Sequence, residues 1–245
     1  MYPAPPHLSQ RQPSLTSSQL RELVLQVPWF SHLPASAVND MLASSEGRVI
    51  EHHEWLFRQG EAAQALYVVI SGGLRLARTA ADGRLATIRC IEPGGAAGEL
   101  SMLSKTPRYL CSAEALSRTE VLELDLAQCW RYIDGNAECR AMFMQQLSDE
   151  LTERLEDMVL LTQGDALARL VSFILRQLPT PLRLPGVVHL DTPKYLLAAQ
   201  LAMTPETLSR LLTRLRGSGA ISVERQQVIV HDDQRLREMT AMKKA

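Results

Sequence analysis

Three side chains near the C-terminus have the chemistry and the spacing to read DNA. Glu206, Ser209 and Arg210 stand at positions i, i+3 and i+4, so on a helix they share one face. A carboxylate accepts a hydrogen bond from cytosine N4, a guanidinium donates to guanine, and a hydroxyl can contact a base edge or a phosphate. We therefore predict that these residues contact bases in the major groove of double-stranded DNA.

The neighbouring residues supply the helix that would present this face. Thr204 is suited to cap it, Pro205 to occupy its first position, and Gly217–Gly219 to end it. Its opposite face is apolar and consists of Leu208, Leu211, Leu212 and Leu215. Because Lys194–Ala202 has the pattern of a short preceding helix, the whole segment predicts a helix-turn-helix.

A wing and local positive charge complete this C-terminal module. Ala220–Val223 and Gln227–Val230 alternate around a polar turn, which predicts a two-stranded wing. From Thr192 onward there are nine Lys/Arg and five Asp/Glu, whereas the whole chain has a net charge of −1. We expect phosphate contacts from this module, at Lys194, Thr204, Thr207, Arg214 and Arg216. The alternative is a structural helix bundle with a solvated charged face.

The centre of the chain changes to short β-prone runs separated by turn signals. These runs are Gly47–Ile50, Glu54–Phe57, Leu66–Ile70, Leu74–Arg78, Ala86–Ile91 and Val121–Leu124. Their spacing predicts an antiparallel β-roll, that is, a double-stranded β-helix or jelly roll, which encloses a space for a small ligand. With the helical C-terminal module, the expected fold class is α+β.

A long helix is expected after the roll, from Ala137 to Thr162. Its apolar residues recur at spacings of three and four, and we assign the dimer seam to Met144, Leu147, Leu151, Leu155 and Met158. At 1.5 Å per residue the helix spans about 40 Å, more than one roll can cover. A homodimer would bury the excess; in the alternative, the stripe packs only on its own roll.

These features give a domain plan. It comprises a flexible arm (1–18), an effector-sensing roll (19–135), a dimerisation helix (136–163) and a winged helix-turn-helix domain (164–245). No apolar run approaches the roughly 20 residues of a membrane span, and the N-terminus has no signal core, so a cytoplasmic protein is expected. The chain carries no phosphate loop or nucleophile elbow, so we expect no enzyme; a structural scaffold remains the rival class.

The order of parts resembles the CRP/FNR superfamily of bacterial transcription factors. The resemblance rests on Phe57–Glu61, Leu66–Gly72, Gly98–Leu100 and Glu206–Arg210. The set Glu206, Ser209 and Arg210 is similar to the fumarate-nitrate branch, which implies a TTGAT-N4-ATCAA-like palindrome. It implies base-edge contacts for Glu206 and Arg210 and a thymine contact for Ser209. RNA polymerase is the further partner that the resemblance implies.

The resemblance also implies an effector pocket in the roll. We assign it to Gly98, Glu99, Leu100, Met102, Arg108, Tyr109, Cys111 and Ser112. Cyclic AMP binding in the family uses an arginine directly before a Ser/Thr-Ala pair, but here Cys111 precedes Ser112 and Ala113. A buried phosphate without that charge binds poorly, so cyclic AMP is disfavoured and kept as the alternative.

Two other sensing chemistries of the family can be weighed. An iron-sulfur cluster needs closely spaced N-terminal cysteines, and this chain has none before Cys90, so no cluster is expected. The stretch Thr106–Tyr109 instead resembles nitric-oxide-responsive denitrification regulators, which implies heme. The candidate axial ligands are His32, His52, His53, Met102, Cys90 and Cys111. Because His52 and His53 are adjacent on an expected strand, at most one can face the pocket.

Overall fold

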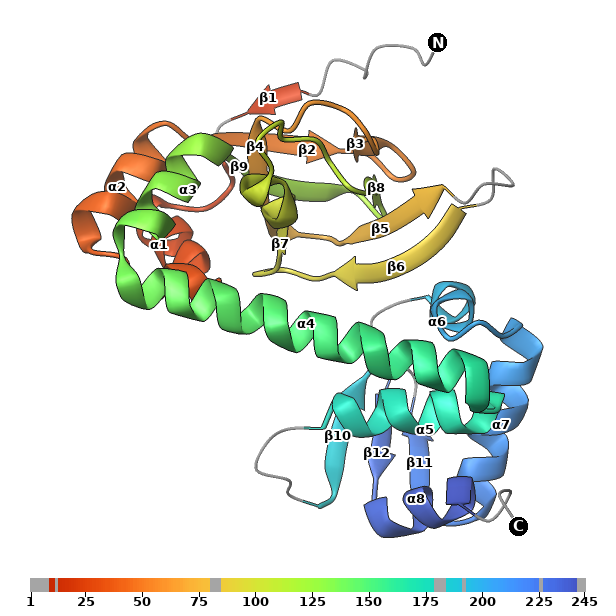
Figure 1. Cartoon of the computed structure of the whole chain (residues 1–245). Coiled ribbons are helices and arrows are strands. Elements are labelled where there is room, and N and C mark those ends of the chain that lie inside the picture. Colours follow the sequence, from red (N-terminus) through yellow and green to blue (C-terminus); the bar gives the residue numbers. More distant parts are fainter. Residues whose placement is uncertain are drawn as a thin grey trace. The chain divides into compact units, whose positions relative to one another are not determined.

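The computed structural model describes residues 9–11, 13–79, 85–178, 184–190, 193–224 and 227–241. The chain divides into two compact units, Met1–Asp149 and Glu150–Ala245. Their boundary falls inside the long helix α4 (Ala137–Gln163), drawn in green in Figure 1. Within the ranges given above, no helix combines the length and the apolar character that crossing a membrane requires.

The first unit is built on antiparallel sheets, as the roll prediction requires (Figure 1). One sheet has the order β1 (Ser9–Arg11), β2 (Glu46–Ile50), β9 (Thr119–Asp125), β4 (Ala65–Ser71) and β7 (Ala96–Ala97). The other has the order β3 (Trp55–Phe57), β8 (Ser112–Ala115), β5 (Leu74–Thr79) and β6 (Leu85–Ile91). Strands β7 and β8 were not predicted, because alanine and serine have little strand propensity of their own.

The predicted flexible arm is wrong at residues 9–11 and 17–18, which form a strand and the start of a helix. Ser9 to Arg11 form a strand whose register pairs Ser9 with Val49 and Arg11 with Gly47. Helix α1 (Ser17–Gln26) begins at a capping box, in which Thr16 accepts from the Gln19 amide and Gln19 accepts from the Thr16 amide. That Thr-x-x-Gln signal was present in the sequence. Residues 1–8 and 12 of the arm lie outside the described part.

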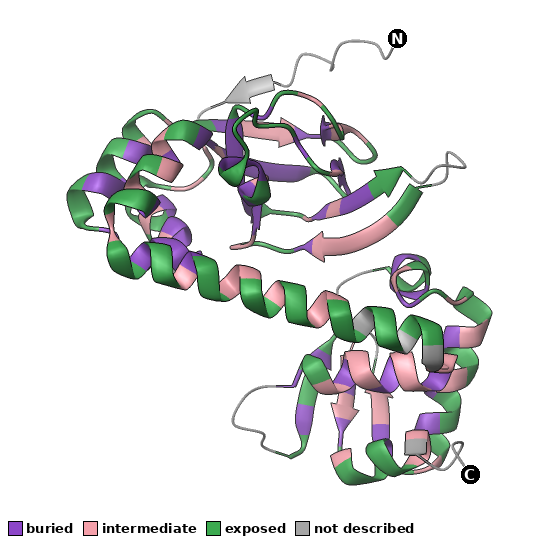
Figure 2. Cartoon of the chain, viewed as in Figure 1, coloured by how far each residue is buried: buried purple, intermediate pink, exposed green. Residues whose placement is uncertain are grey.

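Helices close one end of the roll. They are α1, the 3-10 helix η1 (Pro28–Phe30), α2 (Ala35–Ala43) and α3 (Leu126–Gly135). The first turns of α4 join this packing through Phe143, whose ring lies edge-on to Trp29 at 5.3 Å and to Trp130 at 6.2 Å between centroids. Figure 2 shows the resulting change along α4, which contributes buried residues near its start and none farther along that the structure describes.

The second unit is a winged helix-turn-helix. Its elements are α5 (Ala166–Arg176), β10 (Gly186–His189), α6 (Lys194–Gln200), α7 (Pro205–Gly217), β11 (Ile221–Glu224), β12 (Gln227–Val230) and α8 (Asp233–Ala241). The sheet order is β10-β12-β11, so β10 adds a strand to the predicted wing. Sequence spacing gave no signal for β10, because the pairing joins segments about 40 residues apart.

Gly72 makes a tight turn contact in the roll and yields a stability prediction. A Cβ at Gly72 (φ +79°) would lie 2.6 Å from Thr119 Oγ1 and 2.7 Å from the Arg118 carbonyl oxygen. Thr119 cannot easily move away, because its hydroxyl accepts from the Gly73 amide at 3.1 Å and donates to the Gly73 carbonyl at 3.0 Å. Gly60 has a similar φ of +85° but open space around it.

We therefore expect Gly60→Ala to cost roughly 1–2 kcal/mol of unfolding free energy, the left-handed backbone penalty alone. Gly72→Ala should cost about 1–3 kcal/mol more, because overpacking adds to that penalty. Urea denaturation of the two variants measures the difference. Equal losses would show that the contact with Thr119 carries no energy.

Candidate DNA interface and effector pocket

Helix α7 presents the predicted reading residues on one exposed face. Thr204 caps the helix, its hydroxyl accepting from the Thr207 amide at 3.2 Å, and Pro205 occupies the first turn. Glu206, Ser209 and Arg210 are exposed. On the opposite side Leu208, Leu212 and Leu215 are buried in the core of the second unit, and Leu211 is half-buried against it. The structure thus brings the three predicted base-contacting residues together and leaves them free to meet a ligand.

The turn between α6 and α7 is held by a residue that sequence reasoning missed. Ala202 has a left-handed φ of +49°, which is costly for alanine. Arg169 of α5 stabilises this turn: its Nε donates to the Leu201 carbonyl at 2.8 Å and its Nη2 donates to the Ala202 carbonyl at 3.2 Å. The sequence of α5 does not predict these hydrogen bonds, because an arginine on the polar side of an amphipathic helix is expected to be solvated.

The charges of this face suit a nucleic acid. The pKa of Glu206 is lowered, first by a hydrogen bond with its own backbone amide at the helix N-terminus, then by the Thr204 hydroxyl and the Arg210 charge. The carboxylate therefore stays ionised and acts only as an acceptor. Lys194, Arg214 and Arg216 are exposed and Thr207 is half-buried. Their phosphate contacts stay predictions, as do the base contacts.

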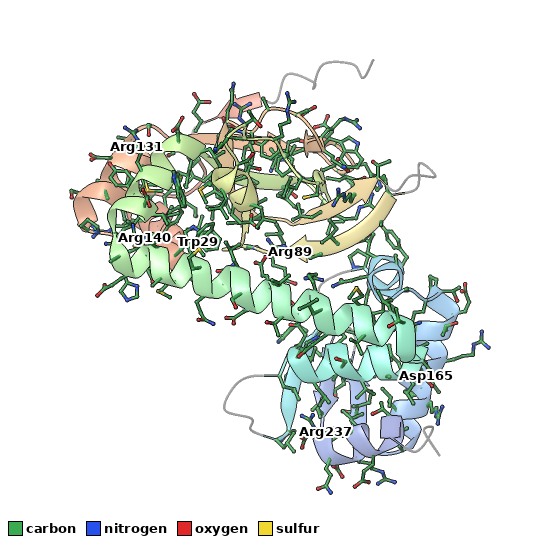
Figure 3. The ribbon with its side chains drawn as sticks, in the orientation of Figure 1. Trp29, Arg89, Arg131, Arg140, Asp165 and Arg237 are labelled. Carbon is green, nitrogen blue, oxygen red and sulfur yellow. The ribbon has the colours of Figure 1, made fainter. Side chains whose placement is uncertain are left out.

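The predicted effector loop is shaped by Gly98. Its φ of +98° and its nearness to the Ala65 carbonyl, 3.1 Å from a Cβ built there, favour glycine. The 3-10 helix η2 (Glu99–Leu103) follows. Glu99 is buried, and its Oε1 accepts from Arg89 Nη2 of β6 at 2.8 Å; Arg89 is labelled in Figure 3. This Arg89 pairing was not predicted. It could have been suspected from the charged residue inside an apolar strand.

Cys111 lies close enough to Glu99 and Arg89 to be affected by both charges. It is half-buried, and burial raises the pKa of its thiol to about 11, with a further increase from the charge of Glu99 and a decrease from Arg89 and Arg78. The thiol is therefore neutral near pH 7. Glu99 is held by Arg89, and the neutral Cys111 stands at the position where the family resemblance implies an arginine.

Several other residues assigned to the effector pocket are engaged by other parts of the first unit. Tyr109 is in the core of the roll, where its ring stacks on Phe57 at 3.9 Å and its hydroxyl donates to the Ala65 carbonyl at 2.9 Å. Arg108 is exposed and donates from Nη1 to the Gly60 carbonyl at 2.7 Å, which turns it toward the β3–β4 loop. Met102 is buried in the hydrophobic core, Ser112 accepts from the Gln59 amide at 2.9 Å, and Leu100 is exposed.

The histidines proposed as heme ligands do not converge on the roll interior. His52 and His53 lie in the turn before β3, not on a strand, and their rings stack at 3.8 Å. The expectation that they point to opposite faces is therefore wrong. His53 Nδ1 lies 2.9 Å from Glu114 Oε1, a carboxylate that also pairs with Arg75. His32 is exposed, with Nδ1 2.9 Å from the Ser31 hydroxyl. These positions do not fit heme ligation.

Comparisons with known proteins agree with this architecture. The cyclic nucleotide-binding domain family model matches residues 48–136, and the Crp-like helix-turn-helix domain model matches residues 168–239. The chain is 28% identical over 216 residues to the anaerobic regulatory protein of Bacillus subtilis strain 168, covering 86% of this chain and 90% of the relative. It is 28% identical over 209 residues to the transcriptional activator protein Anr of Pseudomonas aeruginosa, covering 82% and 84%.

A solved structure shows the same fold. FixK2 from Bradyrhizobium japonicum superposes with a TM-score of 0.66 at 23% identity, covering 79% of this chain and 96% of that protein.

Proposed function

This chain belongs to the CRP/FNR superfamily of transcription regulators, and we propose that it reads a TTGAT-N4-ATCAA-like palindrome as a homodimer. The observation that carries the proposal is the exposed set Glu206, Ser209 and Arg210 on α7, backed by leucines buried in the same unit. The function is binding and allostery rather than catalysis. A regulator of this kind would act in the cytoplasm with RNA polymerase as a partner.

In this proposal the two halves of the α7 surface have different tasks. Glu206 and Arg210 contact base edges, and Ser209 contacts the thymine end of the half-site. Arg214 and Arg216, farther along the helix, contact phosphates together with Lys194, Thr204 and Thr207. Contacts to bases give specificity, whereas contacts to phosphates give affinity on any sequence.

The homodimer is supported by an uncovered apolar stripe on α4. Met144, Leu151, Leu155 and Met158 are 51–62% exposed, although their side chains are large and apolar. Leu147 differs, because it is half-buried against the core of the first unit, so this surface gives no support for a place of Leu147 in the seam. Spacings of seven, four and three between Met144, Leu151, Leu155 and Met158 suit a coiled coil. Two α7 helices one DNA turn apart would then match the palindrome.

Effector control in the roll is the remaining part of the proposal. The loop at Gly98 and Glu99 supports a regulated pocket, and a change there would shift the equilibrium between two arrangements of the dimer. We keep heme with nitric oxide and cyclic AMP as the two effector classes to test. For heme, the exposed histidines give no support. For cyclic AMP, the Arg89–Glu99 pair would have to open and Cys111 supplies no charge.

The base-reading role predicts a loss of discrimination in Glu206→Ala. We expect it to weaken binding to TTGAT-N4-ATCAA by about 1–3 kcal/mol and to equalise the affinities for variants at one base pair. Arg214→Ala should weaken binding to every sequence alike and reduce the salt slope by about 1, as one phosphate contact does. Mobility-shift titrations on specific and scrambled duplexes measure both. Equal losses of Glu206→Ala on the two duplexes would contradict its role.

The dimer seam predicts that Leu151→Glu separates the subunits, because two carboxylates would face each other in an apolar interface. Sedimentation velocity should show a monomer, and affinity for the palindrome should fall at least 100-fold. Thr152→Glu adds the same charge to the adjacent exposed position and should remain dimeric. A monomeric wild-type protein, or dimers in both variants, would overturn the seam.

The effector proposal predicts ligand-dependent DNA binding. Fluorescence anisotropy of a labelled TTGAT-N4-ATCAA duplex would be measured anaerobically with the protein alone, with heme, with heme and nitric oxide, and with cyclic AMP. We expect at least tenfold tighter binding in one effector state. Tightening with cyclic AMP alone would favour the alternative class, and the same affinity in every state would refute control by either.

A further inference from the structure

A cavity of about 630 Å³ lies in the first unit, beside the end of η2 that is opposite to Glu99. It is bounded by the end of η2 and the segment after it, the segment before β4, and the first turns of α3. Its lining consists of Ala63, Gln64, Met102, Leu103, Ser104, Lys105, Pro107, Asp125, Leu126, Ala127 and Trp130. Glu99, Arg89 and Cys111 do not line it, and Met102 is the one residue that it shares with the set assigned to the effector pocket.

The lining is an apolar surface with one available cation. Met102, Leu103, Leu126 and Trp130 supply large apolar side chains. Lys105, the only lysine before Lys194 in the sequence, forms no ion pair with any residue that the structure describes. Its charge is therefore free to meet a ligand at the edge of an apolar site.

The acid in the lining is already engaged. Asp125 is the N-cap of α3, and its Oδ1 accepts from the Gln128 amide at 2.6 Å. The carboxylate of Asp125 is thus offset by the positive end of a ten-residue helix. Ser104 is also occupied, because its hydroxyl donates to the Thr106 carbonyl at 3.1 Å. Lys105 is left as the charged group that would select the ligand.

We propose that this cavity binds a small carboxylate with an aromatic or aliphatic body. The body would pack on Trp130 and Leu126, and the carboxylate would accept hydrogen bonds from the Lys105 ammonium. The volume lies within the roughly 300–1,000 Å³ of ligand pockets, which are mainly apolar with few polar groups that fix orientation. The proposal of this binding site does not depend on the palindrome or the dimer, although the site shares η2 with the predicted effector loop.

The position of the cavity also connects it to α4. Trp130 packs edge-on against Phe143 of α4 at 6.2 Å, and Phe143 meets Trp29 at 5.3 Å; Figure 3 labels Trp29 beside the first turns of α4. A ligand on Trp130 is thus one ring contact away from the helix that carries the proposed dimer seam. This regulatory consequence rests on the proposed function, whereas ligand binding itself does not.

The test uses the full-length protein and two probes that differ in charge, 4-phenylbutanoate and 4-phenylbutanamide. Isothermal titration calorimetry gives each affinity, and tryptophan fluorescence excited at 295 nm reports changes around the three tryptophans, of which Trp130 lines the cavity. We expect the acid to bind at least tenfold more tightly than the amide. Lys105→Gln should remove this preference and Lys105→Arg should retain it, because either cation can hold a carboxylate.

Two further variants separate this site from general apolar binding. Arg131→Gln removes a neighbouring exposed cation of α3 that does not line the cavity and should leave the preference unchanged; Arg131 is labelled in Figure 3. Ala127→Phe should fill the cavity and weaken both probes at least tenfold, with the unfolding midpoint checked by circular dichroism. Equal affinities for acid and amide, equal effects of Lys105→Gln and Arg131→Gln, or no binding at millimolar probe would overturn the proposal. Palindrome binding measured in parallel distinguishes this failure from failure of the proposed function.

Discussion

The burial of one face of α7 governs what its other face can do. Leu208, Leu212 and Leu215 are driven into the core of the second unit, and burial of each leucine stabilises the fold by about 1.5–3 kcal/mol. With that face fixed, the helical repeat leaves Glu206, Ser209 and Arg210 in solvent. The polar side chains proposed to contact DNA thus depend for their position on apolar side chains that are buried away from it. The hydrogen bonds from Arg169 to the Leu201 and Ala202 carbonyls also stabilise the turn between α6 and α7.

Helix α4 also has an apolar face, but most of that face stays exposed. The first turns of this helix bury Phe143 and part of Leu147 against the roll, but Leu151, Leu155 and Met158 find no cover among the described residues of this chain. An apolar stripe of that length in water calls for a second surface. A copy of the same helix supplies that surface, because two identical chains can pair through the same residues about a two-fold axis. A two-fold dimer also matches a palindromic target, so the uncovered stripe and the palindrome belong to one proposal.

In the roll, charge pairing decides what the interior can accept. Glu99 is buried and already paired with Arg89, so a ligand that used either group would first have to break an ion pair. Cys111 adds a neutral thiol where a phosphate would need a cation. The cavity beside α3 presents the reverse case, an apolar lining with the unpaired ammonium of Lys105 at its side. The roll thus combines a buried ion pair at Glu99 with an apolar cavity beside α3.

Much of this organisation was determined by local sequence. The period of apolar residues predicted α4 and α7, the Thr204-Pro205 start and Gly217–Gly219 end located α7, and the β-prone runs predicted the core strands of the roll, because these signals act within a few residues. Tertiary structure alone decided the pairs that join distant segments. It placed Tyr109 in the core, turned Arg108 to Gly60, put His52 and His53 in a turn, and joined β1 and β10 to their sheets. Such contacts depend on which distant residue the folded chain brings within a few ångströms. Residue type and local spacing do not predict which residue that is.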